Sequence, residues 1–488
     1  MSAKLRILVL SAEVAPFAKT GGLGDVVGAL PKALAALGHD VRVMLPAYQA
    51  QERAVREGER GLAAMPGGLA VPTGAGPLQA GVFESRLPDS DVPVYFIAES
   101  SLFDRPRLYG YDDDPYRFAF FSRAALELTA ALEWSPDVVN AHDWHAAPAV
   151  MWLATAGRAD ERFAHVGTVF TIHNMAHQGR SSRSVSRYLG VAVPPMIEEG
   201  GWDEVNFMAR GIYHATLINT VSPTYAEEIM TPEGGFGLDG LLRARRSDVR
   251  GILNGLDEVV WNPATDRRLA QVFDAAAAEG RKANKRALQE RLGLRPDDDV
   301  PLLAMVTRLD AQKGMEITGH VVHLLMNGLA GNAQFVVLGS GAKPYEDAFA
   351  HLASYHREKM AAVLMFAPEL APLVYGGSDL FLMPSLFEPC GLGQLIAMRY
   401  GSVPVVRRTG GLADTVRDGV TGFTFDAYTA DAFWTALQRA LLVYNTDAAS
   451  WARIRHAGMT SCVSWSDSAR AYEALYVSAL ERVRSDLR

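Results

Sequence analysis

The chain has 488 residues, of which 49% are hydrophobic and 21% charged, and its formal net charge is −8. This length exceeds the roughly 100–200 residues of a usual domain, so at least two hydrophobic cores are expected. The composition excludes a disordered chain, a collagen or a disulfide scaffold, and the negative charge argues against nucleic acid or an anionic membrane as a partner, because both require a basic face.

Cysteine usage indicates a reducing compartment. Cys390 and Cys462 are the only cysteines, too few for a secreted disulfide framework and without metal-ligand spacing, so a cytoplasmic location is expected. The first apolar run, Ile7–Leu10, gives way to polar residues before it reaches the length of a signal peptide, and we interpret it as a strand. No segment has the roughly 20 apolar residues of a transmembrane helix.

The first half of the chain repeats one pattern: a short apolar run, a turn, and a helical period. After Gly22, apolar residues recur at helical spacing until Gly38 ends the helix. The pattern predicts a parallel sheet with helices on both faces. The expected strands are Ile7–Leu10, Val41–Leu45, Val94–Ile97, Val138–Asn140 and Val169–Ile172.

The pattern breaks near residue 255 and restarts after a polar, alanine-rich stretch. We therefore expect an α/β fold with two doubly wound, Rossmann-like domains, at residues 1–255 and 256–462, and a deep cleft between them where ligands of such folds bind. Residues 463–488 show one apolar helical face and should pack on another part of the chain. The strands expected in the second domain are Leu302–Val306, Phe335–Leu338, Val363–Phe366, Leu380–Met383 and Val403–Val406.

The turn between the first strand and the first helix has the composition of an anion or sugar site. It reads Lys19-Thr20-Gly21-Gly22-Leu23-Gly24-Asp25. Glycines let the backbone approach a ligand closely, the helix N-terminus presents free N–H groups, and Lys19 adds a positive charge. The alternative is a glycine-rich turn with a solvated lysine.

A second basic turn follows the first strand of the second domain. It runs from Thr307 to Gly314 and contains Arg308 and Lys313. Arg308 can hold a phosphate through two hydrogen bonds and Lys313 can act as a point charge, which suits a diphosphate. The alternative is a pair of ordinary surface cations.

A third turn, Phe387-Glu388-Pro389-Cys390-Gly391-Leu392-Gly393-Gln394, follows a strand and enters a helix. Glu388 there could accept hydrogen bonds from sugar hydroxyls or offset positive charge that develops on a sugar ring. It could instead stabilise the N-terminus of the helix at Gly391. Cys390 is better explained as a buried filler than as a nucleophile. A further glycine turn, at Arg407–Val416, could also receive phosphate oxygens.

Histidines and an aspartate follow two strands of the first domain. His142, Asp143 and His145 lie in one turn, and His173 precedes Asn174 in another. The histidines lack the helical spacing and the glutamate of a zinc protease site, so no metal is expected. Hydrogen bonding to a polyhydroxylated substrate is the better interpretation, with Trp144 as a packing or stacking surface.

Together these segments resemble the bacterial and plant glycogen and starch synthase family. The similarity covers nearly the whole chain and rests on the order and spacing of many motifs. They are Ser11–Pro16, the Lys19 turn, His142–Ala146, Phe170–Asn174 with Gln178-Gly179, Asn206–Gly211, Thr220–Ile229, Asn254–Asp257, Arg308–Gly314, Glu388–Leu392 and Arg407–Val416.

The resemblance implies a GT-B fold and a cytoplasmic, retaining glucosyltransferase that uses ADP-glucose as donor and an α-1,4-glucan as acceptor, without metal or another cofactor. By resemblance, residues 1–255 are the acceptor side, residues 256–462 the nucleotide-sugar side, and residues 463–488 return to the first domain. The implied catalytic residues are Glu388, His173, Lys313, Arg308 and Asp143. The implied donor-binding residues are Lys19, Gly21, Gly22, Asp25, Asn174, Asn254, Arg308, Lys313, Cys390, Gly391 and Leu392.

Some positions depart from the family pattern. Gly393 stands where the family commonly has threonine, Ala342 replaces a common aspartate, and the segment Met365–Leu373 differs on the side expected to hold the base. Two alternatives therefore stay open. One is a related GT-B enzyme that uses UDP-glucose or another acceptor, and the other is a non-catalytic glucan-binding homologue.

Overall fold

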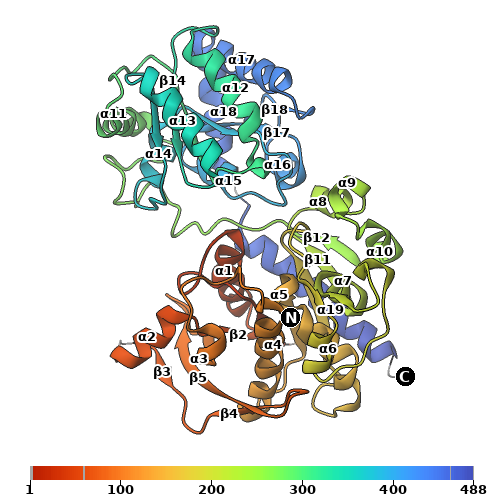
Figure 1. Ribbon diagram of the computed structural model, residues 1–488. Helices are drawn as coiled ribbons and strands as arrows, with labels where there is room; N and C mark the ends of the chain where they lie inside the picture. The colour runs from red at the N-terminus through yellow and green to blue at the C-terminus, as the bar shows by residue number, and fades with distance from the viewer. Residues whose placement is uncertain (1–3, 59–60, 462, 487–488) are drawn as a thin grey trace. The chain divides into compact units, whose positions relative to one another are not determined.

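The computed structural model describes residues 4–58, 61–461 and 463–486. Cys462, and with it the expected end of the second domain, lies outside these residues. The chain forms two compact units: unit 1 contains residues 1–254 and 465–488, and unit 2 contains residues 255–464. In Figure 1, unit 1 runs from red to green and includes a final blue helix, and unit 2 runs from green to blue.

Unit 1 is built on one large sheet of order β12-β11-β8-β7-β1-β2-β6-β5-β3, with β4 paired to β5. The strands from β12 to β6 are parallel, whereas β5 runs antiparallel to β6, β3 and β4. The strand bounds are β1 Arg6–Leu10, β2 Asp40–Pro46, β3 Ala63–Ala64, β4 Leu69–Val71, β5 Leu78–Arg86, β6 Pro93–Ala98, β7 Val138–His142, β8 Gly167–Ile172, β11 Leu217–Thr220 and β12 Val249–Gly251. A separate small sheet pairs β9 Arg180–Ser182 with β10 Glu204–Asn206.

The sequence predicted β1, β2, β6, β7 and β8 of the parallel part of this sheet, and it missed the parallel strands β11 and β12 and the antiparallel extension. In β5 buried and exposed positions mostly alternate, as expected where one face of a sheet is solvated, so its apolar signal is weak. The helices of unit 1 are α1 Gly22–Ala36, α2 Gln49–Glu57, α3 Ser100–Phe103, α4 Asp114–Ala131, α5 Asp143–Ala154, α6 Ser184–Tyr188, α7 Phe207–His214, α8 Pro223–Glu228, α9 Pro232–Gly235, α10 Asp239–Ala244 and α19 Trp465–Asp486.

The last helix, α19, completes the core of unit 1 by packing on α1 and β8. Two of its tyrosines bond to buried asparagines of the sheet: Asn140 on β7 donates to the Tyr476 hydroxyl and Asn219 on β11 to that of Tyr472, both at 2.8 Å. Each tyrosine hydroxyl thus gives a buried asparagine side-chain N–H an acceptor that the sheet does not supply. The apolar face predicted from the sequence is buried, with Ala469, Tyr472, Leu475, Tyr476, Ala479 and Val483 in the core.

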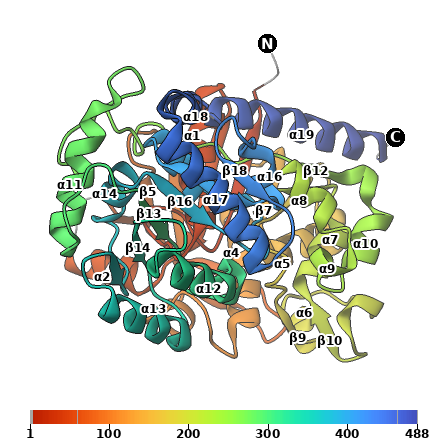
Figure 2. The same ribbon diagram turned by 90° about the horizontal axis from the view of Figure 1, so that it is seen from above.

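Unit 2 contains a wholly parallel sheet of order β15-β14-β13-β16-β17-β18. Alternate residues of its strands enter two separate cores. Leu303 and Met305 pack under α12 (Met315–Met326), α13 (Lys343–Tyr355) and α17 (Ala430–Thr446), which lie together in Figure 2. Leu302 and Ala304 pack under α11 (Arg281–Leu292), α14 (Ala371–Gly377) and α15 (Gly393–Arg399). Helices therefore cover both faces, as expected for a doubly wound sheet. The strands are β13 Leu302–Val306, β14 Gln334–Leu338, β15 Met360–Val363, β16 Leu380–Met383, β17 Val403–Arg407 and β18 Phe423–Phe425.

One strand prediction in unit 2 was wrong. The expected strand Val363–Phe366 lies at Met360–Val363, where Val363 is already the last residue to pair with β14. Met365 and Phe366 are 59% and 81% exposed, so their hydrophobicity does not reflect burial in the sheet. The helices are α11 Arg281–Leu292, α12 Met315–Met326, α13 Lys343–Tyr355, α14 Ala371–Gly377, α15 Gly393–Arg399, α16 Gly410–Thr415, α17 Ala430–Thr446 and α18 Ala448–Thr460, with short 3-10 turns at Ala156–Ala159, Ile197–Glu199, Arg246–Asp248, Ala278–Gly280 and Ala311–Lys313.

The parallel topology gathers the expected site loops. Because β1, β7 and β8 are parallel, the turns that follow them leave the same edge of the unit 1 sheet. The turns after β13, β16 and β17 do the same in unit 2. Among the described helices, none combines the length and the hydropathy that a membrane crossing requires.

Candidate functional site

The Lys19 turn of unit 1 is held in place by a buried carboxylate. Glu13, 4% exposed, accepts hydrogen bonds from the backbone N–H groups of Thr20 and Gly21 and from the hydroxyls of Thr20 and Tyr109. Gly21 and Gly22 then open α1 without a side-chain cap. Glu13 therefore holds the conformation of the turn, and, among the described residues, no side chain caps the backbone N–H groups at the start of α1.

Lys19 itself does not stand alone. Its ammonium group lies 2.6 Å from a carboxylate oxygen of Asp25 on the first turn of α1, and both side chains are partly exposed. The pair combines a cation and an anion at the edge of the sheet. An exposed pair of this kind is weak enough to exchange with a ligand.

Asp143 begins α5 directly after β7, and both its backbone conformation and its pKa are shifted from ordinary values. Its backbone adopts a positive φ of 57°, and its side chain accepts a 2.7 Å hydrogen bond from the N–H of His173. Burial raises the pKa of Asp143 to about 7, against the opposing effect of the N–H groups of His173 and Asn174. Near neutral pH the group therefore exists both as an acid and as a carboxylate.

His142 and His173 form a hydrogen-bonded pair across neighbouring strands. Nδ1 of His142 lies 2.8 Å from Nε2 of His173. Burial lowers the pKa of His173 to about 3 and holds that of His142 well below its usual value, so both rings are neutral at pH 7 and one donates while the other accepts. Nε2 of His142 is buried without a partner among the described residues.

Asn174, Asn254 and His145 are the other polar residues of unit 1 that the sequence singled out. Asn174 accepts a hydrogen bond from the N–H of Ala176, which stabilises the turn after β8. Asn254, the last residue of the first segment of unit 1, is buried and its side-chain oxygen has no partner among the described residues. His145 stacks between Tyr109 and Trp144 and does not join the His142–His173 pair. No group of three or more acidic, histidine or cysteine side chains in the described part of the chain is arranged to hold a metal ion.

In unit 2, the turn after β13 presents two cations with different surroundings. Arg308 is largely exposed and lies 3.3 Å from a carboxylate oxygen of Asp310. The same Asp310 side chain accepts a hydrogen bond from the N–H of Lys313 and so fixes the short helical turn between them. Lys313 points back into the unit.

Lys313 meets Glu388 from the turn after β16. The ammonium nitrogen lies 2.6 Å from Oε2 of Glu388, and Ser385 donates to the same oxygen at 3.0 Å. Glu388 is only 5% exposed, so the ion pair is nearly desolvated. The suggested helix-cap role of Glu388 is wrong, because its carboxylate is bonded to these two side chains and α15 begins at Gly393 without a side-chain cap.

Glycines make this close approach of loops possible. Gly314 follows Lys313 with φ +76°, and a Cβ there would lie 2.1 Å from the carbonyl oxygen of Pro384. Gly411, at the start of α16, donates its N–H to the carbonyl oxygens of Glu388 and Pro389. The turns after β13, β16 and β17 therefore interlock through backbone contacts that larger residues would prevent.

The residues Cys390, Gly391 and Leu392 connect Glu388 to α15. Cys390 is buried, Gly391 has a positive φ of 72°, and Leu392 is the residue before the helix. Gln394 donates to the carbonyl oxygens of Cys390 and Gly391 and thereby fixes this turn.

Comparisons with known proteins decide the family. Residues 6–244 match the starch synthase catalytic domain, and residues 289–451 match glycosyl transferases group 1. Glycogen synthases of Geotalea daltonii and Moorella thermoacetica are 43% and 44% identical to this chain, over 97% and 99% of its length and 98% and 99% of theirs. The chain belongs to the glycogen and starch synthase family.

The fold expected from the resemblance is confirmed. The catalytic domain of starch synthase IV from Arabidopsis thaliana, solved bound to ADP and acarbose, matches 98% of this chain with a TM-score of 0.91 and 35% identity, over all of that chain. Sucrose-phosphate synthase from Thermosynechococcus elongatus, 18% identical with a TM-score of 0.57, shares the fold alone. This family member is thus a glycosyltransferase of the GT-B fold, with the function of a glycogen or starch synthase.

One departure from the glycogen and starch synthase pattern has a structural explanation. A Cβ on Gly393 would lie 3.2 Å from the ring of Phe381 and 3.3 Å from the sulfur of Met383, so these two side chains fill the space that the common threonine would need. Sequence reasoning missed Glu13 and Ser385 as supporting residues. Glu13 lay inside a motif that carried the resemblance, and Ser385 stands three residues before Glu388, so spacing alone offered a weak signal for both.

Proposed function

We propose that this chain transfers glucose from ADP-glucose to the non-reducing end of an α-1,4-glucan and keeps the α configuration. The observation that carries the proposal is the nearly desolvated pair of Lys313 and Glu388 beside the exposed guanidinium of Arg308. Arg308 and Lys313 can bind a diphosphate, and Glu388, which is bonded to Lys313, can bind a sugar. The solved complex of the starch synthase IV relative with ADP supports the choice of adenine nucleotide.

The diphosphate would be neutralised by side chains of this chain. Arg308 can release its exposed Asp310 partner and donate two parallel hydrogen bonds to phosphate oxygens. Lys313 can keep one N–H on Glu388 and direct the others to the diphosphate, since an ammonium group has three donors. We propose no metal or other cofactor, because these charges can stabilise the leaving group.

The glucose would be held by carboxylates and the histidine pair. Glu388 has a second oxygen, Oε1, that can accept a hydrogen bond from a sugar hydroxyl, and its charge would offset the positive charge that develops on the ring. Asp143 and His173 are proposed as further sugar contacts in unit 1. The neutral form of His173 can accept or donate without placing a positive charge beside the ring. Lys19, Gly21, Gly22, Asp25, Asn174, Asn254, Cys390, Gly391 and Leu392 complete the proposed donor contacts.

Retention follows if departure and attack occur on the same face of the sugar. The bond between the anomeric carbon and the diphosphate oxygen breaks, and the 4-hydroxyl oxygen of the glucan forms the new bond. Its proton passes to the departing diphosphate oxygen, so atoms and charge balance. The role of the chain is to hold the two oxygens on one side and to stabilise the charge of the leaving group.

One assay separates the proposal from its alternatives. Turnover with ADP-glucose and with UDP-glucose is measured at equal concentration, with and without glycogen. We expect glycogen-dependent transfer that is faster with ADP-glucose. Faster turnover with UDP-glucose would overturn the donor assignment, and failure of both donors with a folded protein would favour the non-catalytic homologue. The cytoplasmic location stays a prediction.

A further inference from the structure

Unit 2 contains a pocket at the edge of its sheet opposite to the candidate site. It has a volume of about 540 Å³, within the roughly 300–1,000 Å³ of typical small-molecule sites. Asp379, in its floor, immediately precedes β16, and its carboxylate accepts the N–H of Leu302, the first residue of β13. The candidate site follows the other ends of these same two strands, about 15 Å away for strands of this length.

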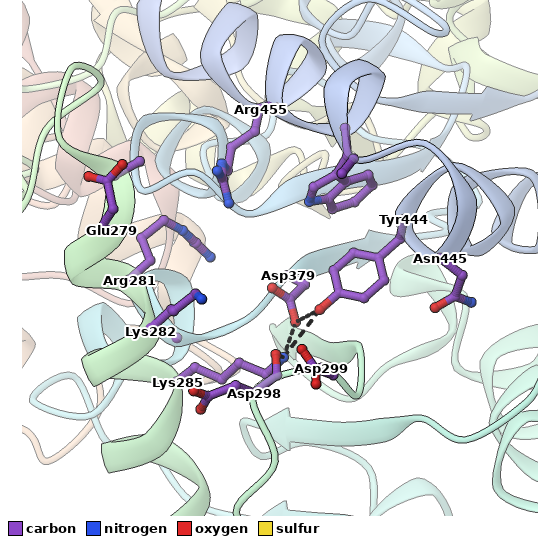
Figure 3. Close-up of a pocket in the computed structure, with 15 residues that line it drawn as sticks. Glu279, Arg281, Lys282, Lys285, Asp298, Asp299, Asp379, Tyr444, Asn445 and Arg455 are labelled. Carbon is purple, nitrogen blue, oxygen red and sulfur yellow. Dashed lines mark hydrogen bonds and ion pairs between the residues drawn. The ribbon is translucent and has the colours of Figure 1, made fainter.

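The walls of the pocket carry cations without carboxylate partners. Arg281 and Lys282 extend from the start of α11, and Arg455 extends from α18 towards the same space (Figure 3). Within the described residues, no carboxylate lies at ion-pair distance from any of these three side chains. Arg281 is only 5% exposed and donates through its terminal nitrogens to the carbonyl oxygens of Gly376, Ser378 and Tyr400, whereas its buried Nε has no partner.

The carboxylates of the pocket are mostly engaged or exposed. Asp379 is held by Lys285 at 2.8 Å, and Asp298 pairs with Arg286 outside the pocket at 3.0 Å. Glu279 and Asp299 are exposed at the rim and can be solvated. The lining thus holds four cations and four carboxylates, but among the described residues none of these carboxylates forms an ion pair with Arg281, Lys282 or Arg455.

Burial of the Arg281 guanidinium beside another cation disfavours its charged form. Burial lowers the pKa of Arg281 to about 10. The charge of Asp379 opposes this shift, and the charge of Arg455 adds a smaller lowering. An anion between Arg281 and Arg455 would offset their mutual repulsion. Two planar guanidinium groups and a lysine are the donors that bind phosphate oxygens best.

The other walls suit a small organic group. Trp451 and Tyr444 meet edge to face at 5.0 Å, and Asn445 adds an amide at the mouth. The volume is larger than a lone phosphate requires. We propose that this pocket binds a small phosphate monoester, with the phosphate between Arg281, Lys282 and Arg455 and the organic part against Trp451 and Tyr444.

Calorimetric titration of the full chain tests this site with three probes: inorganic phosphate, ribose 5-phosphate and ribose. We expect both anions to bind and to compete, and ribose not to bind. The variant Arg455→Gln should weaken both anions at least about 10-fold, the loss of one charge-assisted hydrogen bond. Lys282→Gln provides a second, exposed position with the same expected direction. Ribose 5-phosphate should bind more tightly than phosphate, because its organic part contacts Trp451 and Tyr444; equal binding of the two would overturn the monoester assignment.

Two variants serve as matched controls. Arg453→Gln removes the same charge from the same helix at an exposed position bonded to Ser450, outside the pocket, and should change binding less than 2-fold. Lys313→Ala removes the cation of the candidate site. If anion binding is lost in Lys313→Ala but kept in Arg455→Gln, or if Arg453→Gln weakens it as much as Arg455→Gln, or if ribose binds as well as ribose 5-phosphate, the proposal is wrong.

Discussion

The ammonium nitrogen of Lys313 lies 2.6 Å from Oε2 of Glu388, although 75 positions separate the two residues in the chain. Adjacent parallel strands, β13 and β16, bring their turns together, and both side chains are largely removed from solvent. In such a pair each charge depends on the other, because removal of one partner leaves an uncompensated buried charge. Function and local stability are therefore coupled at this position.

Glu388→Gln should reduce turnover by roughly 10²-fold or more, since it removes a preorganised charge beside the reacting sugar. The amide keeps the shape and can still accept from Ser385 and Lys313, so the variant should fold, although with lower stability because the charge of Lys313 is no longer compensated. Steady-state transfer from ADP-glucose to glycogen measures the effect. Glu290→Gln, on the exposed side of α11, is the control and should behave as wild type. Near-normal turnover of folded Glu388→Gln would refute the assigned role.

Gly314→Ala should damage both stability and activity. Its φ of +76° and the 2.1 Å approach of a new Cβ to the Pro384 oxygen force the turns after β13 and β16 apart. A cost of about 2 kcal/mol is expected for such overpacking, which corresponds to roughly 4–8 °C in the melting temperature of a unit of this size. Thermal unfolding and turnover are the measurements.

Gly319→Ala provides the contrast to Gly314→Ala. It lies on α12 with nothing within 4 Å of an added Cβ, and its φ is not positive. Alanine favours a helix over glycine, so this variant should be equal to or slightly more stable than wild type. Equal melting temperatures for the two alanine variants would mean that the turns do not interlock as described.

His145→Phe should make the protein less sensitive to acid. Burial lowers the pKa of His145 in the folded chain to about 3, below the roughly 6.5 of an unfolded chain. Between these values the unfolded state binds more protons, so stability is lost as pH falls from about 6.5 towards 3, by up to about 1.4 kcal/mol per pH unit for this group. Phenylalanine cannot titrate and fits the aromatic stack of Tyr109 and Trp144.

Melting temperatures between pH 7 and pH 5 measure this effect. The drop over that interval should be smaller in His145→Phe than in wild type, although it should not vanish, because burial also lowers the pKa of His142 and His173. His351→Phe, at an exposed position of α13, is the control. An identical drop in wild type and His145→Phe would show that His145 is protonated in the folded chain.

Transfer from ADP-glucose should proceed in excess EDTA. Arg308 and Lys313, with Lys19, supply the positive charge proposed for the leaving diphosphate. Initial rates with and without chelator should agree within experimental error. Activity that is lost with EDTA and restored by Mg²⁺ or Mn²⁺ would mean that a cation, and not these side chains, carries the charge.

The sequence predicted most of the parallel strands because their interiors are continuous apolar runs, as in β13 and β16. It failed where hydrophobicity and burial separate: Phe366 is apolar but exposed, and β5 is a strand whose exposed face is polar. The local sequence pattern indicates the preference of a residue for burial or for a strand, whereas pairing with a neighbouring strand determines its position in the fold.

The sequence proposed the residues of the candidate site, but it could not predict the contacts between them. The turns with Lys313 and Glu388 could each be recognised, yet their ion pair depends on the strand order, in which β16 lies next to β13. The positive φ of Asp143 and its hydrogen bond to the N–H of His173 depend likewise on β7 lying beside β8. The spacing of residues along the sequence predicts neither the Lys313–Glu388 ion pair nor the Asp143–His173 hydrogen bond.

The place of α19 has a consequence for how the protein is made. Unit 1 consists of the first 254 residues and the last 24, and Tyr472 and Tyr476 bond to asparagines on β11 and β7 of its sheet. During synthesis residues 255–464 are made before these tyrosines, so the core of unit 1 stays incomplete until the end of the chain has left the ribosome. A chain interrupted near its end would thus leave the later unit finished and the earlier one incomplete.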